Sequence, residues 1–155
     1  RQRQLCLRDS FCSALDLAVF ARMMLNGGVV PACLPGEEAG EPCPVARPSD
    51  VTVLERSIQE VFTARYDDTS SRALGWDTPS GQSSAGDYLT SQAYGHTGYT
   101  GTSLWIDPEL DLWVVLLTNR VHPTRENQKH VPLRRAVHDA VALAITDRSI
   151  QQRQP

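Results

Sequence analysis

This sequence has a single lysine, no net positive charge and no long apolar run. Lys129 is the single lysine among 155 residues, and 15 basic against 18 acidic residues give a formal net charge of −3. Such a chain offers no basic field to a nucleic acid and has no acidic tail. No stretch approaches the roughly 18 apolar residues of a membrane-spanning helix. Residues 1–9 are not followed by the apolar segment of a signal peptide. We therefore expect no nucleic-acid partner, no membrane span and no export signal on this chain.

Motifs that bind metals or phosphates are missing as well. The sequence contains no C-x-x-C pair and no H-E-x-x-H, and no lysine follows a glycine as a P-loop requires. The G-x-S-x-G elbow of many hydrolases is also absent, because "GQSSAG" at residues 81–86 has the wrong spacing. We predict no metal site and no cofactor.

Four cysteines lie in the first third of the chain: Cys6, Cys12, Cys33 and Cys43. Cys33 and Cys43 could close a loop in an oxidising compartment. The alternative is that all four are free, partly buried thiols. The sequence leaves their redox state open.

The remaining composition is that of one globular domain, with 41% hydrophobic and 21% charged residues. A chain of this length can bury a core. A helix is predicted over residues 13–26, because Ser13 and Asp16 supply a start signal and Gly27 and Gly28 a stop. Residues 29–48 contain five prolines and are predicted to form a loop.

Two further amphipathic helices are predicted from apolar residues at the helical period. The first opens at Asp50, with Gln59 on its polar side and an apolar face made of Val51, Leu54, Ile58, Val61 and Phe62. The second begins near Pro132, and its apolar face is made of Leu133, Val137, Ala140, Val141 and Ala144. Residues 147–155 are predicted to be a frayed polar tail.

A hairpin is predicted from residues rich in β-branched and aromatic side chains. Its strands are residues 97–106 and the apolar run "LWVVLLT" at 112–118, with the turn "DPELD" between them. The second strand is expected to be covered on both faces. "RALGWDTP" at residues 72–79 is a candidate short strand. Because the strands are contiguous in the chain, we predict an α+β fold with an antiparallel sheet and flanking helices.

His96 is the histidine that invites a functional interpretation. Gly95 and Gly98 flank it, so backbone could approach a ligand closely there, and Thr97 adds a hydroxyl. A lone histidine is nevertheless more often structural. The other histidines, His122, His130 and His138, are predicted to be solvated. Trp105 and Trp113 are predicted to pack in the core.

The segment "HTGYTGTSLWIDPELDLWVVLLTNRVHPT" resembles the third active-site motif, and the strands behind it, of the serine β-lactamase-related family. That family includes class C β-lactamases, serine DD-peptidases and related esterases. "SALDLAVFARMMLNGG" is similar to a helix of the same family. The resemblance covers residues 13–144 and implies a partial β-lactamase/transpeptidase-like fold. It divides the chain into an unassigned segment 1–12, a C-terminal part of the family's domain at 13–146 and the tail.

The resemblance implies roles for four consecutive residues. His96, Thr97 and Gly98 would bind substrate, and the backbone N–H of Tyr99 would be one of two donors of an oxyanion hole. Many β-lactamases have lysine, a fixed positive charge, where His96 stands, whereas histidine is mostly neutral near pH 7. The His-Thr-Gly version is similar to that of DD-peptidases and esterases. The family also implies a small-molecule or peptidoglycan-like substrate and a periplasmic or extracellular location.

The sequence departs from the family in its catalytic motifs. Ser-x-x-Lys is impossible, because Glu126 stands three positions before Lys129, and none of the three asparagines has a tyrosine two positions before it, as Tyr-x-Asn requires. The departure implies the C-terminal part of a serine hydrolase acting on amide or ester bonds, inactive alone and open to complementation by an N-terminal half. The alternatives are an inactive binding protein for peptidoglycan-like or acyl ligands, and a non-functional truncation.

Overall fold

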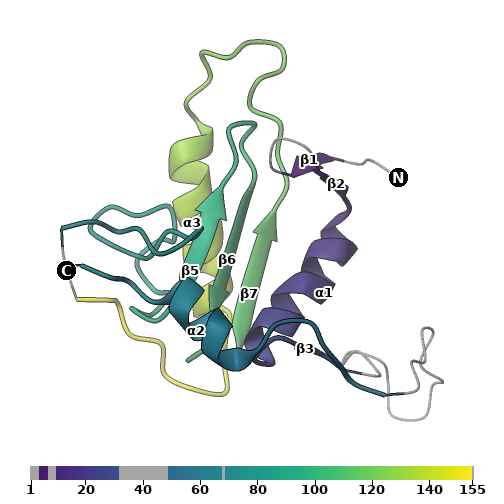
Figure 1. Ribbon diagram of the computed structural model, residues 1–155. Coiled ribbons are helices and arrows are strands. Elements are labelled where there is room, and N and C mark those ends of the chain that lie inside the picture. The colour runs from purple at the N-terminus through teal and green to yellow at the C-terminus, as the bar shows by residue number, and fades with distance from the viewer. Residues whose placement is uncertain (1–3, 7–9, 32–48, 68, 155) are drawn as a thin grey trace.

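The computed structural model describes residues 4–6, 10–31, 49–67 and 69–154. Its centre is a three-stranded antiparallel sheet in the order β5-β6-β7, flanked by helices (Figure 1). The helices are α1 (Ala14–Leu25), α2 (Arg56–Thr63) and α3 (His130–Leu143), and the central strands are β5 (Tyr94–Thr97), β6 (Ser103–Asp107) and β7 (Leu112–Leu116). Two further antiparallel pairs join β1 (Gln4–Cys6) to β2 (Ser10–Cys12) and β3 (Val29–Val30) to β4 (Val51–Thr52). The predicted α+β class is confirmed.

The first predicted helix is confirmed as α1, and local chemistry explains both of its ends. The Ser13 hydroxyl accepts from the Asp16 N–H at 3.3 Å, and the Asp16 carboxylate accepts from the Ser13 N–H at 2.6 Å. This reciprocal pair satisfies backbone donors that the first turn leaves unpaired. Gly27 and Gly28 follow with φ of 67° and 88°, a backbone conformation that glycine adopts without steric cost. Most of the loop predicted over 29–48, with Cys33 and Cys43, lies outside the described residues.

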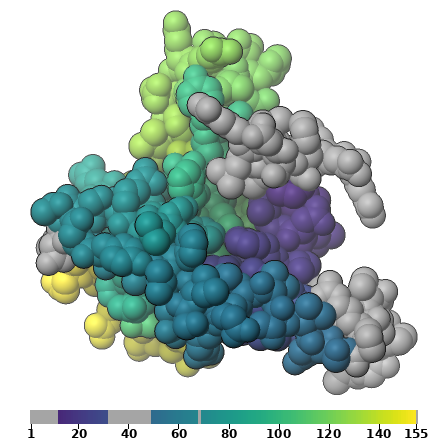
Figure 2. All heavy atoms as spheres, in the orientation of Figure 1, coloured from purple at the N-terminus to yellow at the C-terminus, as the bar shows by residue number. Residues whose placement is uncertain are grey.

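The prediction for α2 was wrong in both its start and its face. Residues 51–52 form β4, paired with β3, and the helix begins only at Arg56. β-Branched side chains at 51–53 favour the extended backbone. Gln59, predicted on the polar side, is only 9% exposed, because its amide donates to the Met24 carbonyl at 2.5 Å. The exposed side carries apolar side chains instead: Ile58, Val61 and Phe62. Figure 2 shows this segment at the surface.

The strand predicted over residues 97–106 is two strands joined by a tight turn. β5 ends at Thr97, the turn spans residues 98–102, and β6 begins at Ser103. Gly98 N–H donates to the Thr102 carbonyl at 2.8 Å, and Gly101 has a φ of 107°, which β-branched or bulky residues rarely adopt. The second predicted strand is confirmed as β7. Within 72–79 only isolated bridges form, one of which pairs Asp77 with Gly95 at the edge of β5.

The two faces of the central sheet pack into separate cores. Tyr94 and Ile106 lie on one face and pack with Ala21 and Met24 of α1. Trp105 lies on the other face and packs with Ala142 of α3. Figure 1 shows the corresponding arrangement, with α1 and α3 on opposite sides of the strands. The predicted core position of Trp105 is confirmed.

The buried face of α3 differs from the predicted one. Its buried residues are Arg134, His138 and Ala142, spaced four apart, while Leu133 and Leu143 are exposed. Polar bonds to the sheet and to loops, described below, decide this orientation. The polar tail is not frayed. Arg153 donates to the Leu89 and Gly86 carbonyls, both at 2.9 Å, and so docks the end of the chain on a loop.

Candidate functional site

His96 lies half-buried in β5, on the face of the sheet that α1 covers. Side chains alternate along a strand, so His96 shares this face with Tyr94. It lines a cavity of about 230 Å³, together with Leu17 and Phe20 of α1, Trp76, Thr97 and Gly98. The Trp76 ring stacks on Phe20 and meets Tyr94 edge-on, with centroid distances of 6.2 and 5.2 Å. The imidazole is thus the basic group of a pocket with largely aromatic and aliphatic walls.

Gly95 and Gly98, which flank His96, both lie in close contact with neighbouring side chains. A Cβ on Gly95 would overlap the Trp105 ring, and one on Gly98 would overlap the Thr102 hydroxyl. Gly98 also lines the cavity beside His96, and its contact with a substrate stays a prediction. Thr97 pairs with Ser103 across the strands and also lines the cavity.

Tyr99 sits at the tip of the turn, with 66% of its surface exposed. Its backbone N–H meets no acceptor in the part of the chain that the structure describes. The guanidinium of Arg120 lies 4.2 Å from the centre of its ring, and the Nε of Arg120 donates to the Tyr99 carbonyl at 2.8 Å. The N–H is therefore available to an incoming oxygen while its neighbouring carbonyl is held.

Arg134 of α3 binds the same turn from the opposite side of the sheet. Its Nη2 donates to the Gly98 carbonyl at 2.7 Å and to the Thr102 carbonyl at 2.8 Å, and its Nε donates to the Gly101 carbonyl at 3.3 Å. Burial lowers the pKa of this guanidinium, and the nearby Arg120 charge adds to the effect. Sequence analysis missed Arg134 and Arg120, although the spacing of Arg134 and His138 would place both on one helix face.

The family model described as Beta-lactamase matches residues 11–139. The chain belongs to the beta-lactamase family. The helices and antiparallel sheets of its described residues form part of a β-lactamase-like fold.

Individual proteins are also similar to this chain. An N-acetylmuramyl-L-alanine amidase of Bacillus subtilis is 30% identical over 72% of this chain and 22% of its own length. Two proteins provisionally named D-alanyl-D-alanine carboxypeptidases are similar too. The one from Salmonella typhi is 30% identical over 79% of this chain and 25% of its own length. The one from Escherichia coli K12 is 29% identical over 77% of this chain and 24% of its own length. This chain spans about a quarter of the length of these relatives.

A buried Ser–His pair links α3 to the central sheet. His138, predicted to be solvated, is fully buried, with Nδ1 2.7 Å from the Ser84 carbonyl and Nε2 3.5 Å from the Ser103 hydroxyl. The short contact to a carbonyl assigns the proton to Nδ1. Burial lowers the pKa of His138. The pair ties α3 to β6 and to the loop at residue 84, and Ser103 also lines the cavity that contains His96.

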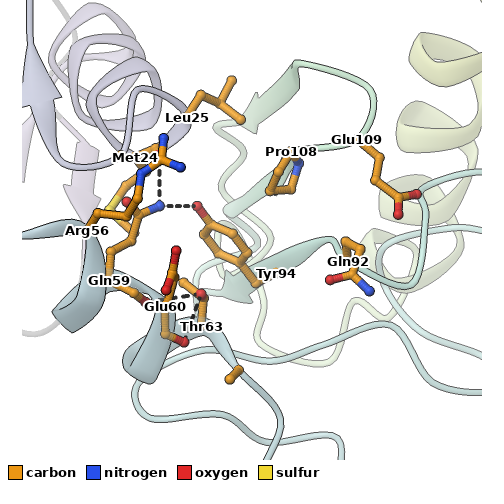
Figure 3. Close-up of a pocket in the computed structure, with 12 residues that line it drawn as sticks. Met24, Leu25, Arg56, Gln59, Glu60, Thr63, Gln92, Tyr94, Pro108 and Glu109 are labelled. Atoms are coloured by element: carbon orange, nitrogen blue, oxygen red, sulfur yellow. Dashed lines mark hydrogen bonds between the residues drawn. The ribbon is translucent and has the colours of Figure 1, made fainter.

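A larger cavity, of about 580 Å³, opens between α2 and the start of β5. Figure 3 shows Gln59 and Tyr94 pointing toward one another inside it; the Gln59 amide nitrogen lies 3.4 Å from the Tyr94 hydroxyl. Burial raises the pKa of that hydroxyl, and the contact with Gln59 opposes the shift. Glu60 and Glu109 also line the cavity.

The described residues contain no cluster of three or more potential metal ligands. None of their helices is long and apolar enough to cross a membrane.

Proposed function

We propose that this chain forms one wall of the active site of a serine hydrolase that cleaves amide or ester bonds through an acyl-enzyme. The observation that carries the proposal is the juxtaposition of His96, in a mostly apolar pocket, with the acceptor-free N–H of Tyr99 three residues later. Membership of the beta-lactamase family supports it. The nucleophilic serine and its lysine base would come from sequence outside these 155 residues.

The proposed chemistry is acyl transfer in two steps. The serine Oγ, losing its proton to the lysine, attacks the substrate carbonyl carbon, and the carbonyl π electrons move onto the oxygen. Tyr99 N–H and the N–H of the serine would stabilise that oxyanion. The C–N or C–O bond then breaks, the leaving group takes the proton, and water hydrolyses the acyl-enzyme. His96 and Thr97 would hold the substrate.

The proposed substrate class is a peptidoglycan-like acyl-D-alanine peptide. Relatives named as amidase and carboxypeptidases support this choice, as does histidine instead of lysine at position 96. A neutral imidazole donates one hydrogen bond to a substrate carboxylate, and a protonated one adds a charge. The apolar walls from α1 and Trp76 would contact the rest of the acyl group.

Two substitutions at one position test the oxyanion donor. In a protein that supplies the Ser-x-x-Lys half, Tyr99→Pro removes the backbone N–H, whereas Tyr99→Ala removes the ring and keeps it. Loss of one oxyanion donor lowers the rate about 10²–10³-fold in a well-studied case. We expect acylation by a fluorescent penicillin to slow by that order in Tyr99→Pro and to stay within a few-fold of wild type in Tyr99→Ala. Equal rates in the two folded variants would contradict the role of this N–H. Reversible ligand binding without acylation would favour the binding-protein alternative.

A further inference from the structure

A single buried guanidinium organises the turn at residues 98–102. Arg134 is 7% exposed, donates to three carbonyls of the turn and has no carboxylate within ion-pair distance in the described part of the chain. Burying a charge without a counter-charge is unfavourable unless hydrogen bonds compensate for the lost water. Among the described residues, the carbonyls of the turn provide that compensation, so the geometry of Arg134 and that of the turn depend on each other.

The hydrogen bond from Arg134 to the Gly98 carbonyl also fixes the direction of the Tyr99 N–H. The Gly98 carbonyl and the Tyr99 N–H belong to one planar trans peptide group, so they point in opposite directions. Because Arg134 draws the carbonyl toward α3, the N–H faces away from α3. Glycine at position 98 has no Cβ to restrain rotation of this peptide, so its orientation depends on the contacts of its carbonyl.

Arg120 holds the next peptide in the same way. Its side chain donates to the Tyr99 carbonyl, and its backbone N–H donates to the Thr100 carbonyl at 2.8 Å. The peptides on both sides of Tyr99 are therefore bound by arginines from two different segments.

We propose that Arg134 is a positioning residue, which keeps the Gly98–Tyr99 peptide in the orientation that leaves the Tyr99 N–H free to bind a substrate oxygen. This inference rests on the proposed function, which assigns that N–H to the oxyanion hole. Arg134 would contact neither substrate nor reacting atoms.

The chain contains a built-in reporter of this peptide's orientation. The Gly98 carbonyl also accepts from the Gly101 N–H at 3.1 Å, so rotation of the peptide away from Arg134 would remove the acceptor of that amide. Arg135 is a matched control on the same helix, because it binds the Ser83 carbonyl and Asp87 and does not touch the turn.

Residue-resolved hydrogen exchange on the full chain tests the proposal. We expect exchange of Gly101 N–H to be at least about tenfold faster in Arg134→Ala than in wild type and unchanged in Arg135→Ala, with the Asp77–Gly95 amides unchanged in both. Millimolar methylguanidinium should restore protection in Arg134→Ala only, which a general loss of stability would not reproduce. If Arg134→Ala does not fold, Arg134→Gln is measured instead.

Wild-type exchange of the Gly101 N–H in a folded Arg134→Ala or Arg134→Gln variant would overturn the proposal. Equally faster amide exchange throughout the sheet in Arg134→Ala would also overturn it. Because the readout involves no substrate, failure of the proposed function would leave this result unaffected, and the two can be told apart.

Discussion

At the scale of single residues, the histidines separate into a candidate ligand-binding group and a structural one. His96 faces a cavity, whereas His138 is fully buried between a carbonyl and a hydroxyl. In the sequence, His96 stands out through its flanking glycines and the family resemblance of its segment, whereas nothing marks His138 as buried. The structural role of His138 depends on the tertiary fold, which the sequence pattern does not show.

His138 should make stability depend on pH. Burial lowers the pKa of this imidazole below its ordinary value of 6.5, so the unfolded chain binds a proton before the folded one does. His138 therefore does not reduce the free energy of unfolding above about pH 6.5. Below that pH the free energy of unfolding falls, by up to about 1.4 kcal/mol per pH unit, until the pH reaches the folded-state pKa. Urea titrations between pH 7.5 and 5 should show this slope, and His138→Gln should flatten it. His122→Gln, in an exposed loop, is the control. An unchanged slope in His138→Gln would contradict the account.

His96 should affect substrate affinity in an assembled enzyme, because it lines the cavity next to Thr97 and Gly98. His96→Lys places a fixed positive charge in this cavity and should lower KM for substrates that carry a carboxylate. Steady-state kinetics of His96→Lys, with His122→Lys as control, check the expectation. An unchanged KM in His96→Lys would contradict a contact between residue 96 and the carboxylate.

At the scale of secondary-structure elements, predictability follows the kind of signal each element carries. α1 and β7 were predicted correctly, because a capping sequence with a glycine stop and a continuous apolar run are local signals. The turn at residues 98–102 was missed, because its β-branched and aromatic residues resemble a strand and only Gly98 and Gly101 mark the reversal. The faces of α2 and α3 were predicted wrongly, since Gln59 and Arg134 are buried by hydrogen bonds to distant carbonyls. The predicted active-site segment was located by family resemblance rather than by pattern.

The capping box of α1 should contribute measurably to stability. Ser13→Ala removes the hydroxyl that accepts the Asp16 N–H, and loss of such a cap typically costs about 0.5–2 kcal/mol. The control is Ser57→Ala, on an exposed position of α2 that caps nothing, and it should change stability by less than about 0.5 kcal/mol. Chemical denaturation of both variants measures the difference. Equal free energies of unfolding for Ser13→Ala and Ser57→Ala would show that the α1 cap does not stabilise the protein.

At the scale of the whole molecule, the chain has surfaces that its described residues do not cover. β7 pairs with β6 on one side, and no strand in the described ranges pairs with its other edge. The outer side of α2 exposes Ile58, Val61 and Phe62, each at 46–50%. Unpaired edges and exposed apolar patches promote association.

We therefore expect the isolated chain to self-associate. Light scattering should give a mass above that of a monomer that rises with concentration, and Phe62→Glu should reduce the association. A monodisperse monomer with cooperative unfolding would instead indicate a self-sufficient domain and would count against the proposal of a divided fold.

The most direct test of the divided active site is an intact-mass measurement after incubation with a fluorescent penicillin. A serine without a base is a poor nucleophile at neutral pH, and none of the chain's 12 serines has a lysine three residues later. We expect no adduct on the isolated chain, and labelling only when a half that carries Ser-x-x-Lys is supplied, in cis or as a second chain, with the adduct on that half. A stoichiometric adduct on any serine of these 155 residues would contradict the account.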